Sequence, residues 1–274
     1  MRRRSARIGA VAALATVALA VGACGDGSSK SDDPVEAAQD SLANVKRVTI
    51  ELRLTATAGS ADDRTGDVGF ALTGPLQLPE GDGDLPIADL RSTRMFGRAK
   101  GEVETQFVST GSRAWVSNGS ELVELKGKQL DGLRGTTKGG ADLEALHLSR
   151  WFATRKVTER GGTTTVTGTL DAPSAINDVV TLAGSSGGDA GGARLQGKDA
   201  EQLRSLVRSS SVELVSSADG GLQRLHFDVH FAPDEASKSA VARLLPSLAG
   251  VDLTFDLRLR NVGRKVTVRP PSGA

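Results

Sequence analysis

Apolar and polar residues alternate along several segments of this chain, as they do in β-strands that bury one face. The clearest case is VDLTFDLRLR at 251–260, where Val251, Leu253 and Phe255 alternate with polar residues. Successive side chains of a strand point to opposite faces, so the apolar ones share one side. The same pattern predicts strands over 48–58, 68–72 and 225–231, and weaker ones over 102–109, 113–117, 121–126, 163–170 and 212–216.

The segments between these strands predict how they are joined. SNGS at 117–120 and ADGG at 218–221 contain the Asn, Asp and Gly that tight hairpin turns favour. Strands that follow one another through short turns pair antiparallel. The glycine-rich stretches 78–86 and 184–197 predict longer, mobile loops. Neither stretch indicates a second domain, so residues 34–274 are expected to form a single domain.

Helical spacing of apolar residues appears in five segments. The first begins with Asp33 as the expected N-cap and Pro34 at the first helical position. The other four begin at 141, 173, 198 and 233. The apolar stripe of the first helix is Val35, Ala38, Leu42 and Val45, and that of the helix from 198 is Leu203, Leu206 and Val207, with Asp199 as its cap. An α+β fold is therefore predicted, with one curved antiparallel sheet of about nine or ten strands covered by helices.

The N-terminal segment is typical of an export signal. It has four arginines within the first seven residues, an apolar run from Ile8 to Val21, and small residues before Cys24, the only cysteine of the chain. The apolar run is shorter than the roughly 18 residues expected of a membrane-spanning helix. VGAC at 21–24 resembles the bacterial lipobox, in which the cysteine sulfur is acylated and becomes the first residue after cleavage.

This pattern predicts a lipoprotein signal peptide over 1–23, lipidation of Cys24, and a disordered tether over 24–33. The protein would then be exported and anchored at the outer face of the cytoplasmic membrane. The alternative is an ordinary signal peptide with an incidental cysteine.

Composition and net charge limit the partners and the kind of core that this protein can have. Loss of the first 23 residues leaves 30 Lys and Arg against 33 acidic residues, a net charge of −3, which argues against a nucleic-acid partner. Aromatic residues make up only 3% of the chain, so the core must consist mainly of Leu, Val and Ala. A single cysteine forms no internal disulfide, so the core alone must stabilise the domain.

One stretch has the form of a catalytic motif. GSSGG at 184–188 matches G-x-S-x-G with Ser186 in the middle. A nucleophile elbow lies between a strand and a helix, whereas this stretch follows a predicted helix and continues into more glycine. A flexible loop is the favoured interpretation, so no catalytic residue is predicted and the protein is not expected to be an enzyme.

Groups that resemble metal sites are also better explained by structure. His226 and His230 share the polar face of one strand with Asp228, but residues four apart on a strand are about 13 Å apart, too far for both histidines to bind one ion. Three other features are also better explained without a ligand or modification. His147 has no evident partner, and the acidic residues Glu80, Asp82 and Asp84 lack the ligand spacing of a calcium loop. The sequon at Asn118 is explained by the hairpin turn. No metal site and no cofactor are expected.

Four stretches resemble the LppX/LprA/LprF/LprG lipoproteins of high-GC Gram-positive bacteria: DPVEAAQDSLANVKRVTIELRLTA, AWVSNGSELVELKG, TTTVTGTLDA and DLRLRNVGRKVTVRPPSG. The resemblance extends from Pro34 to Pro271. It implies a half-barrel of antiparallel strands, related to the LolA and LolB carriers, with helices on the concave side. It also implies an apolar cavity that holds the acyl chains of lipids or glycolipids.

The apolar strand faces are the expected lining of that cavity. Valine and leucine fill less volume than aromatic side chains, and an apolar cavity without polar partners favours apolar guests. The expected ligand-binding residues are Val48, Ile50, Leu52, Leu54, Phe70, Leu72, Phe227, Val229, Phe231, Leu253, Phe255 and Leu257. The expected partners are an acyl lipid or glycolipid and the membrane that holds the anchor, and a membrane transporter is a candidate further partner. The alternative is a non-catalytic envelope lipoprotein with a filled core that acts through its surface.

Overall fold

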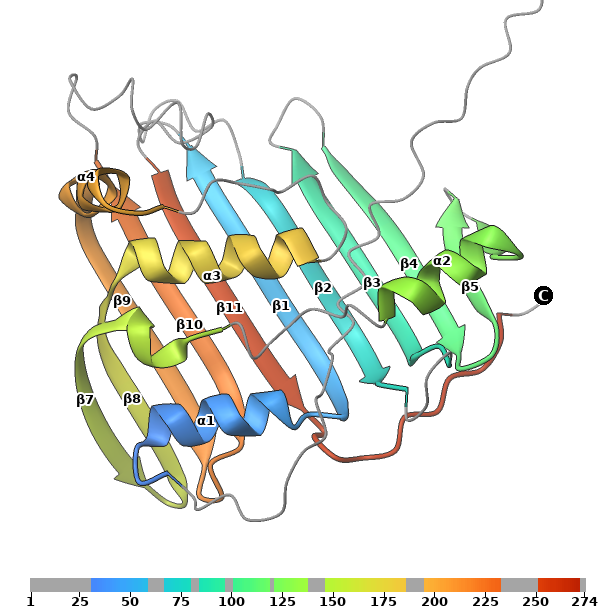
Figure 1. Cartoon of the computed structure of the whole chain (residues 1–274), viewed down its shortest axis with the longest axis horizontal. Coiled ribbons are helices and arrows are strands. Elements are labelled where there is room, and N and C mark those ends of the chain that lie inside the picture. The colour runs from blue at the N-terminus through green and yellow to red at the C-terminus, as the bar shows by residue number, and fades with distance from the viewer. Residues whose placement is uncertain are drawn as a thin grey trace, which may run out of the picture.

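The computed structural model describes residues 31–58, 67–79, 84–96, 101–118, 121–137, 146–185, 195–232 and 251–271. These residues form one open, curved sheet of eleven antiparallel strands, with helices lying across its concave face (Figure 1). The α+β class with a helix-covered half-barrel is therefore confirmed.

The strand order explains how the sheet is built from the two halves of the chain. The strands of the first half are β1 (Arg47–Ala58), β2 (Asp67–Gln77), β3 (Ile87–Phe96), β4 (Glu102–Thr110), β5 (Ala114–Asn118) and β6 (Glu121–Glu124). Those of the second half are β7 (Phe152–Arg160), β8 (Thr163–Leu170), β9 (Val207–Ser217), β10 (Leu222–Phe231) and β11 (Val251–Arg260). Each half runs as neighbouring antiparallel strands, and β11 returns to pair with β1, so β6 and β7 are the two edges.

Helix α1 (Pro34–Ala43) forms as its sequence predicts. The Asp33 carboxylate accepts a hydrogen bond from the Val35 amide at 3.0 Å, and Pro34 occupies the first helical position. Its apolar stripe is buried against β8, β9 and β10. The Leu222 amide at the start of β10 donates to the Ser41 hydroxyl at 3.0 Å, which ties the helix to the sheet.

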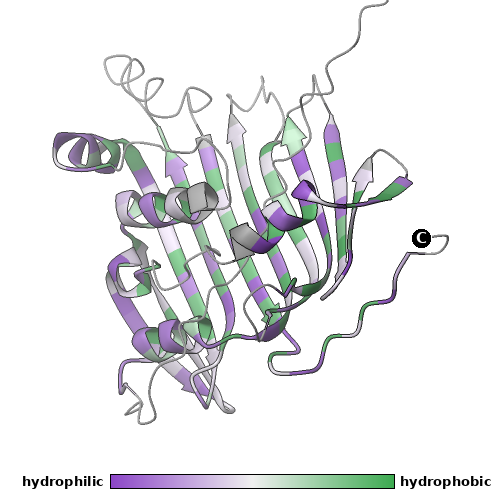
Figure 2. Cartoon of the chain, turned by 45° about the vertical axis from the view of Figure 1, so that its right-hand side comes forward, coloured by the Kyte–Doolittle hydropathy of each residue, from purple (hydrophilic) through white to green (hydrophobic). Residues whose placement is uncertain are grey.

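Four further helical elements lie on the same face. They are α2 (Lys128–Thr137), the 3-10 helix η2 (Leu148–Trp151), α3 (Ala172–Ser185) and α4 (Lys198–Leu206). In Figure 1, α1 and η2 lie over β8 to β11, α3 runs from β9 across β11 and β1, and α2 lies over β4 and β5. Hydropathy alternates along the strands in Figure 2, so the apolar side of the sheet faces these helices.

Over β9 to β11, the opposite face of the sheet is charged. Arg224 on β10 binds Glu213 on β9 at 2.9 Å and Asp256 on β11 at 2.6 Å, and Arg258 also contacts Asp256, at 2.8 Å. Cross-strand pairs of opposite charge of this kind favour the native register. The C-terminal segment begins with a hydrogen bond from the Gly263 amide to the Arg47 carbonyl and runs past the ends of β1 to β5 (Figure 1).

Most predicted elements are present in the structure, and several predictions were wrong. Strands β3 and β7 and helix α2 were not predicted. In the described part of the helix expected from 141, the chain forms only η2 and then enters β7 at Phe152, because Trp151 turns into the core. Helix α4 is capped by Gly197 at φ 52° instead of Asp199, and Val207, a β-branched residue, starts β9.

Some predictions lie outside the described residues. These are the signal peptide over 1–23, Cys24, most of the tether, Ser186 and the helix expected from 233. Helix α3 ends at Ser185, directly before the G-x-S-x-G serine, where a nucleophile elbow would require a strand.

Candidate functional site

The twelve predicted ligand-binding residues lie together on the helix-facing side of the sheet. Cross-strand pairing brings them into register, since Leu54 pairs with both Phe70 and Phe255, and Phe255 pairs with Phe227. Nine of them belong to the buried core, while Leu54, Phe70 and Leu253 are partly buried and pack against it. The sequence therefore located the apolar face of the sheet correctly.

Trp151 occupies this face over β10 and β11, which the sequence did not predict. The indole is fully buried and meets the rings of Phe227 and Phe255 edge-on, at centroid distances of 5.7 and 6.0 Å. The two phenylalanine rings stack at 5.1 Å. Such aromatic pairs add to the energy of burial alone. In this region the apolar face is filled by side chains of the protein itself.

Helix α3 holds Trp151 in place through one carboxylate. Asp178 Oδ2 accepts hydrogen bonds from Trp151 Nε1 and from the His147 amide, both at 2.8 Å. His147 Nδ1 also lies 3.8 Å from Asp178 Oδ1, so this histidine has a partner that the sequence did not reveal. Buried N–H groups are costly when left unpaired, so Asp178 couples α3 to η2.

The same face is less covered at the ends of β2, β3 and β4. Val68, Phe96 and Val103 are 37%, 43% and 50% exposed, although they share this face with the buried core. Val68 pairs directly with Phe96, and Phe70 lies beside them, partly buried. We call these four residues the β2–β4 patch. Among the described residues, no helix lies over this end of the three strands (Figure 1).

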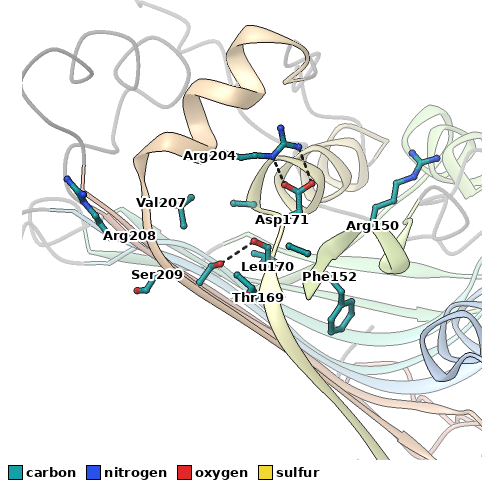
Figure 3. A pocket seen from close by; sticks show the side chains of 12 residues that line it. Arg150, Phe152, Thr169, Leu170, Asp171, Arg204, Val207, Arg208 and Ser209 are labelled. Carbon is teal, nitrogen blue, oxygen red and sulfur yellow. Dashed lines mark hydrogen bonds and ion pairs between the residues drawn. The ribbon is translucent and has the colours of Figure 1, made fainter. Parts of the chain in front are cut away.

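A pocket of about 460 Å³ lies at the other side of the sheet, where β8 and β9 separate (Figure 3). The last pair of the β8–β9 ladder is Gly168 with Val212, although β8 continues to Leu170 and β9 begins at Val207. Beyond that pair the Ser210 hydroxyl donates to the Leu170 carbonyl at 3.2 Å. The strands therefore diverge without leaving this carbonyl unpaired.

Two β-bulges shape the pocket. Phe152 pairs with Leu170 and Thr154 with Thr169, so Ala153 is an extra residue on β7. On β9 the register shifts in the same way, which leaves Arg208 as the extra residue. Both extra residues line the pocket. Bulges bend a strand and redirect its side chains, and they occur often beside functional sites.

Gly168 allows β7 and β8 to approach closely below the pocket. A Cβ at this position would lie 1.8 Å from the Thr154 carbonyl oxygen, well inside van der Waals contact. Any other residue would require the backbone of β7 to move. The local geometry of this strand pair therefore depends on glycine.

Three arginines line this pocket, one from each of three elements. Arg150 comes from η2, Arg204 from the last turn of α4 and Arg208 from the bulge of β9. Arg204 forms a two-point contact with Asp171, at 2.9 and 3.2 Å. Burial by itself raises the pKa of Asp171, but the hydrogen bonds from Arg204 and Ser174 and the charge of Arg204 bring that pKa below its usual value. This aspartate is therefore an anion that already has its cation.

A second pocket, of about 440 Å³, lies at the ends of β9, β10 and β11 and includes His230. His230 Nδ1 lies 2.6 Å from Asp252, and His226 Nε2 lies 2.7 Å from Asp228. Each imidazole therefore contacts a neighbouring carboxylate. Within the described part of the chain, no three His, Cys, Asp or Glu residues are grouped as metal ligands.

Comparisons with known proteins concern the fold. No protein-family model matches the chain, and no curated protein matches it. Among solved structures, the chain is similar to LprF from Mycobacterium bovis, with 14% identity and a TM-score of 0.42 over 88% of this chain and 96% of that one. LprF is a member of the lipoprotein group that the sequence resembles. None of the helices in the described ranges has the length and apolar character needed to cross a membrane.

Proposed function

We propose that this protein is an exported lipoprotein, anchored through Cys24, whose domain binds the acyl chains of lipids or glycolipids. It carries or presents them in the cell envelope at the outer face of the cytoplasmic membrane, without catalysis. The observation that supports this most directly is the β2–β4 patch. Large apolar side chains remain 37% to 50% exposed there, on the face that is otherwise the core of the domain.

The energetics favour acyl chains as the ligand. Each methylene group that leaves water contributes about 0.8 kcal/mol. A chain of about ten methylenes therefore supplies on the order of 8 kcal/mol before ordering losses, enough for binding without any specific polar contact. The binding surface comprises the patch together with the less buried members of the predicted lining, Leu54 and Leu253.

Native mass spectrometry of protein purified without detergent tests this function. We expect co-purifying lipid, and we expect Val103→Asp to reduce the lipid-bound fraction because a charge on the patch opposes an apolar ligand. Val262→Asp is the matched control, since Val262 is 51% exposed in the turn after β11, away from the patch. Equal lipid occupancy in both variants, or no lipid in any of them, contradicts the proposal.

The anchor has its own test. Cells fed a clickable palmitate analogue should label the wild-type protein, and Cys24→Ser should abolish the label because no other cysteine is present. Label retained by the serine variant would rule out acylation at this position.

The packing of Trp151 favours a second candidate, an envelope lipoprotein with a filled core that acts through its surface. Over β10 and β11 the expected lining is already covered by the indole. Absence of lipid in every preparation, together with a protein partner recovered by cross-linking in cells, would support this alternative.

A further inference from the structure

We propose that the edge strand β7 pairs with β7 of a second copy of this chain, so that two half-barrels share one continuous sheet. The two β7 strands run antiparallel about a two-fold axis at Val157. The inference goes beyond lipid binding and does not depend on it.

The outer side of β7 is open to another strand. Among the described residues, β8 is the only strand beside β7 in the sheet (Figure 1). All its residues from Ala153 to Arg160 are exposed. The bulge at Ala153 lies at the start of the strand, so Thr154 to Arg160 pair regularly with β8. An edge of this kind presents a row of amide and carbonyl groups that a further strand can bind.

An apolar row of the core ends in water at this edge. Val157 pairs with Val166, and the row continues across the sheet through Leu214 and Leu225. Val166, Leu214 and Leu225 are fully buried, whereas Val157 is 44% exposed. With Val157 opposite Val157 of the second copy, the row would continue into the core of that copy.

The charges beside Val157 are self-complementary. Arg155 and Glu159 lie two residues away on either side, so they share its face of the sheet. In the proposed pairing each Arg155 lies opposite Glu159 of the second copy, and cross-strand pairs of opposite charge favour such a register. Arg155 uses Nη1 for its contact with Asp33 at 2.6 Å, and a guanidinium has further N–H donors.

The other face of β7 selects this register. Lys156 would lie opposite Thr158 of the second copy, and Arg160 opposite Thr154, so no like charges meet. A shift by two residues keeps the same faces aligned, but it places Lys156 opposite either Lys156 or Arg160. Like charges directly opposite each other destabilise a strand pair.

The second edge strand, β6, lacks this complementarity. It has only four residues, Glu121–Glu124, and full antiparallel pairing of two copies would place Glu121 opposite Glu124. A pairing of β6 with β7 would leave a free edge on each copy and would therefore continue into chains of molecules. The closed dimer through β7 is the arrangement that the charges favour.

Disulfide trapping tests the register. Directly opposite residues of antiparallel strands have Cα atoms about 4.5 to 5.5 Å apart, within the range of a disulfide. In a Cys24→Ser background, which removes the only native cysteine, Val157→Cys should give a covalent dimer under mild oxidation. The control is Val123→Cys in the same background, since Val123 is 47% exposed on β6. Cross-linking of the control to the same extent or more would overturn the proposed pairing.

Sedimentation velocity over a concentration series tests the dimer without a cross-link. We expect the wild-type protein, purified without detergent, to form dimers as its concentration rises. Glu159→Lys should weaken the dimer at least tenfold, because two lysines would then oppose Arg155. Glu121→Lys is the matched control on the exposed edge of β6 and should have no effect. Circular dichroism would check that all variants are folded.

Three results would overturn the proposal. The first is a wild-type protein that stays monomeric at every concentration, and the second is equal weakening by Glu159→Lys and Glu121→Lys. The third is assembly beyond the dimer, since pairing through β7 closes after two copies. Each of these results leaves the proposed lipid binding untouched, because native mass spectrometry measures the bound lipid separately.

Discussion

The two halves of the sheet differ in how their helix-facing side is packed. Over β8 to β11, helices α1, η2 and α3 cover the sheet (Figure 1), and Trp151 closes the space above Phe227 and Phe255. Over β2 to β6 the same face retains exposed apolar side chains. Among the described residues, four of the six exposed large apolar ones lie there: Val68, Phe96, Val103 and Val123.

This difference separates two tasks that the proposed lipid carrier must combine. A well-packed region supplies the free energy of folding, because buried aromatic and aliphatic groups are costly to remove. A less covered region leaves apolar surface for a ligand without loss of that stability. Substitutions over β8 to β11 are therefore expected to lower mainly the stability, and substitutions in the β2–β4 patch mainly the lipid binding.

The largest effect on stability is expected for Trp151→Ala. Loss of a buried aromatic side chain typically lowers the free energy of unfolding by about 3 to 5 kcal/mol. The substitution would also remove the edge-on contacts with Phe227 and Phe255. Urea denaturation followed by circular dichroism measures the change. A loss below about 1 kcal/mol would mean that this half is not the stabilising one.

A smaller loss is expected for Asp178→Ala. This substitution leaves Trp151 Nε1 and the His147 amide without their acceptor, at a cost of about 1 to 3 kcal/mol. Asp178→Asn keeps one acceptor oxygen and should recover part of that stability. The same denaturation assay compares the two variants, and identical losses would show that the hydrogen bonds are not the cause.

A pH-dependent contribution is expected on the charged face, from Asp256. Burial alone raises the pKa of this carboxyl, but the hydrogen bond and charge of Arg224 and the charge of Arg258 bring its pKa below the usual 3.8. The unfolded chain then binds the proton more readily, so the ion pairs stabilise the protein above pH 3.8 and this stability disappears as the pH falls through the lowered pKa.

Asp256→Asn should accordingly lower the free energy of unfolding by about 1 to 2 kcal/mol at pH 7, and this difference from wild type should shrink below pH 3.8. Denaturation series at pH 7 and pH 3 measure it. Asp252→Asn is the control, since this side chain is 58% exposed and its pair with His230 should contribute less than about 0.5 kcal/mol. A difference for Asp256→Asn that persists at pH 3 would contradict the role of the ionised carboxylate.

The smallest effect on stability is expected for Phe96→Ala in the β2–β4 patch. Its ring is 43% exposed, so its removal should change the free energy of unfolding by less than about 1 kcal/mol. Lipid occupancy should fall nonetheless, since the ring belongs to the proposed binding surface. A large loss of stability with unchanged lipid binding would reverse the comparison between the two halves.

The sequence predicted most of the strands, and the two that it missed lack a complete apolar face. Strand β3 escaped prediction because Ser92 and Arg94 occupy helix-facing positions and interrupt the alternation. That face is incompletely covered there, so polar residues are tolerated and the periodic signal is weak. Strand β7 is an edge strand whose residues after Phe152 are all exposed, so it has no buried face to mark it.

The aromatic cluster around Trp151 and the pocket at the ends of β8 and β9 could not be predicted from the sequence for another reason. Trp151 reaches its partners from a 3-10 turn, and the pocket that Arg150, Arg204 and Arg208 line lies where β8 and β9 diverge. Their spacing along the chain follows no period. The bulge at Arg208 appears only in the pairing register, so the local sequence alone did not indicate it.

The ion pair at the start of α1 has a consequence for the proposed anchor. Asp33 caps the helix and binds Arg155 on β7 at 2.6 Å, so the start of α1 is held against an edge strand of the sheet. If Cys24 is acylated as we propose, the nine residues after it, up to Asp33, would separate the bilayer from α1 by at most about 32 Å. A strand of ten residues is about 33 Å long, so this distance is comparable to the length of the strands in the sheet. An anchor of this length would let the domain bring either end of its sheet to the membrane surface.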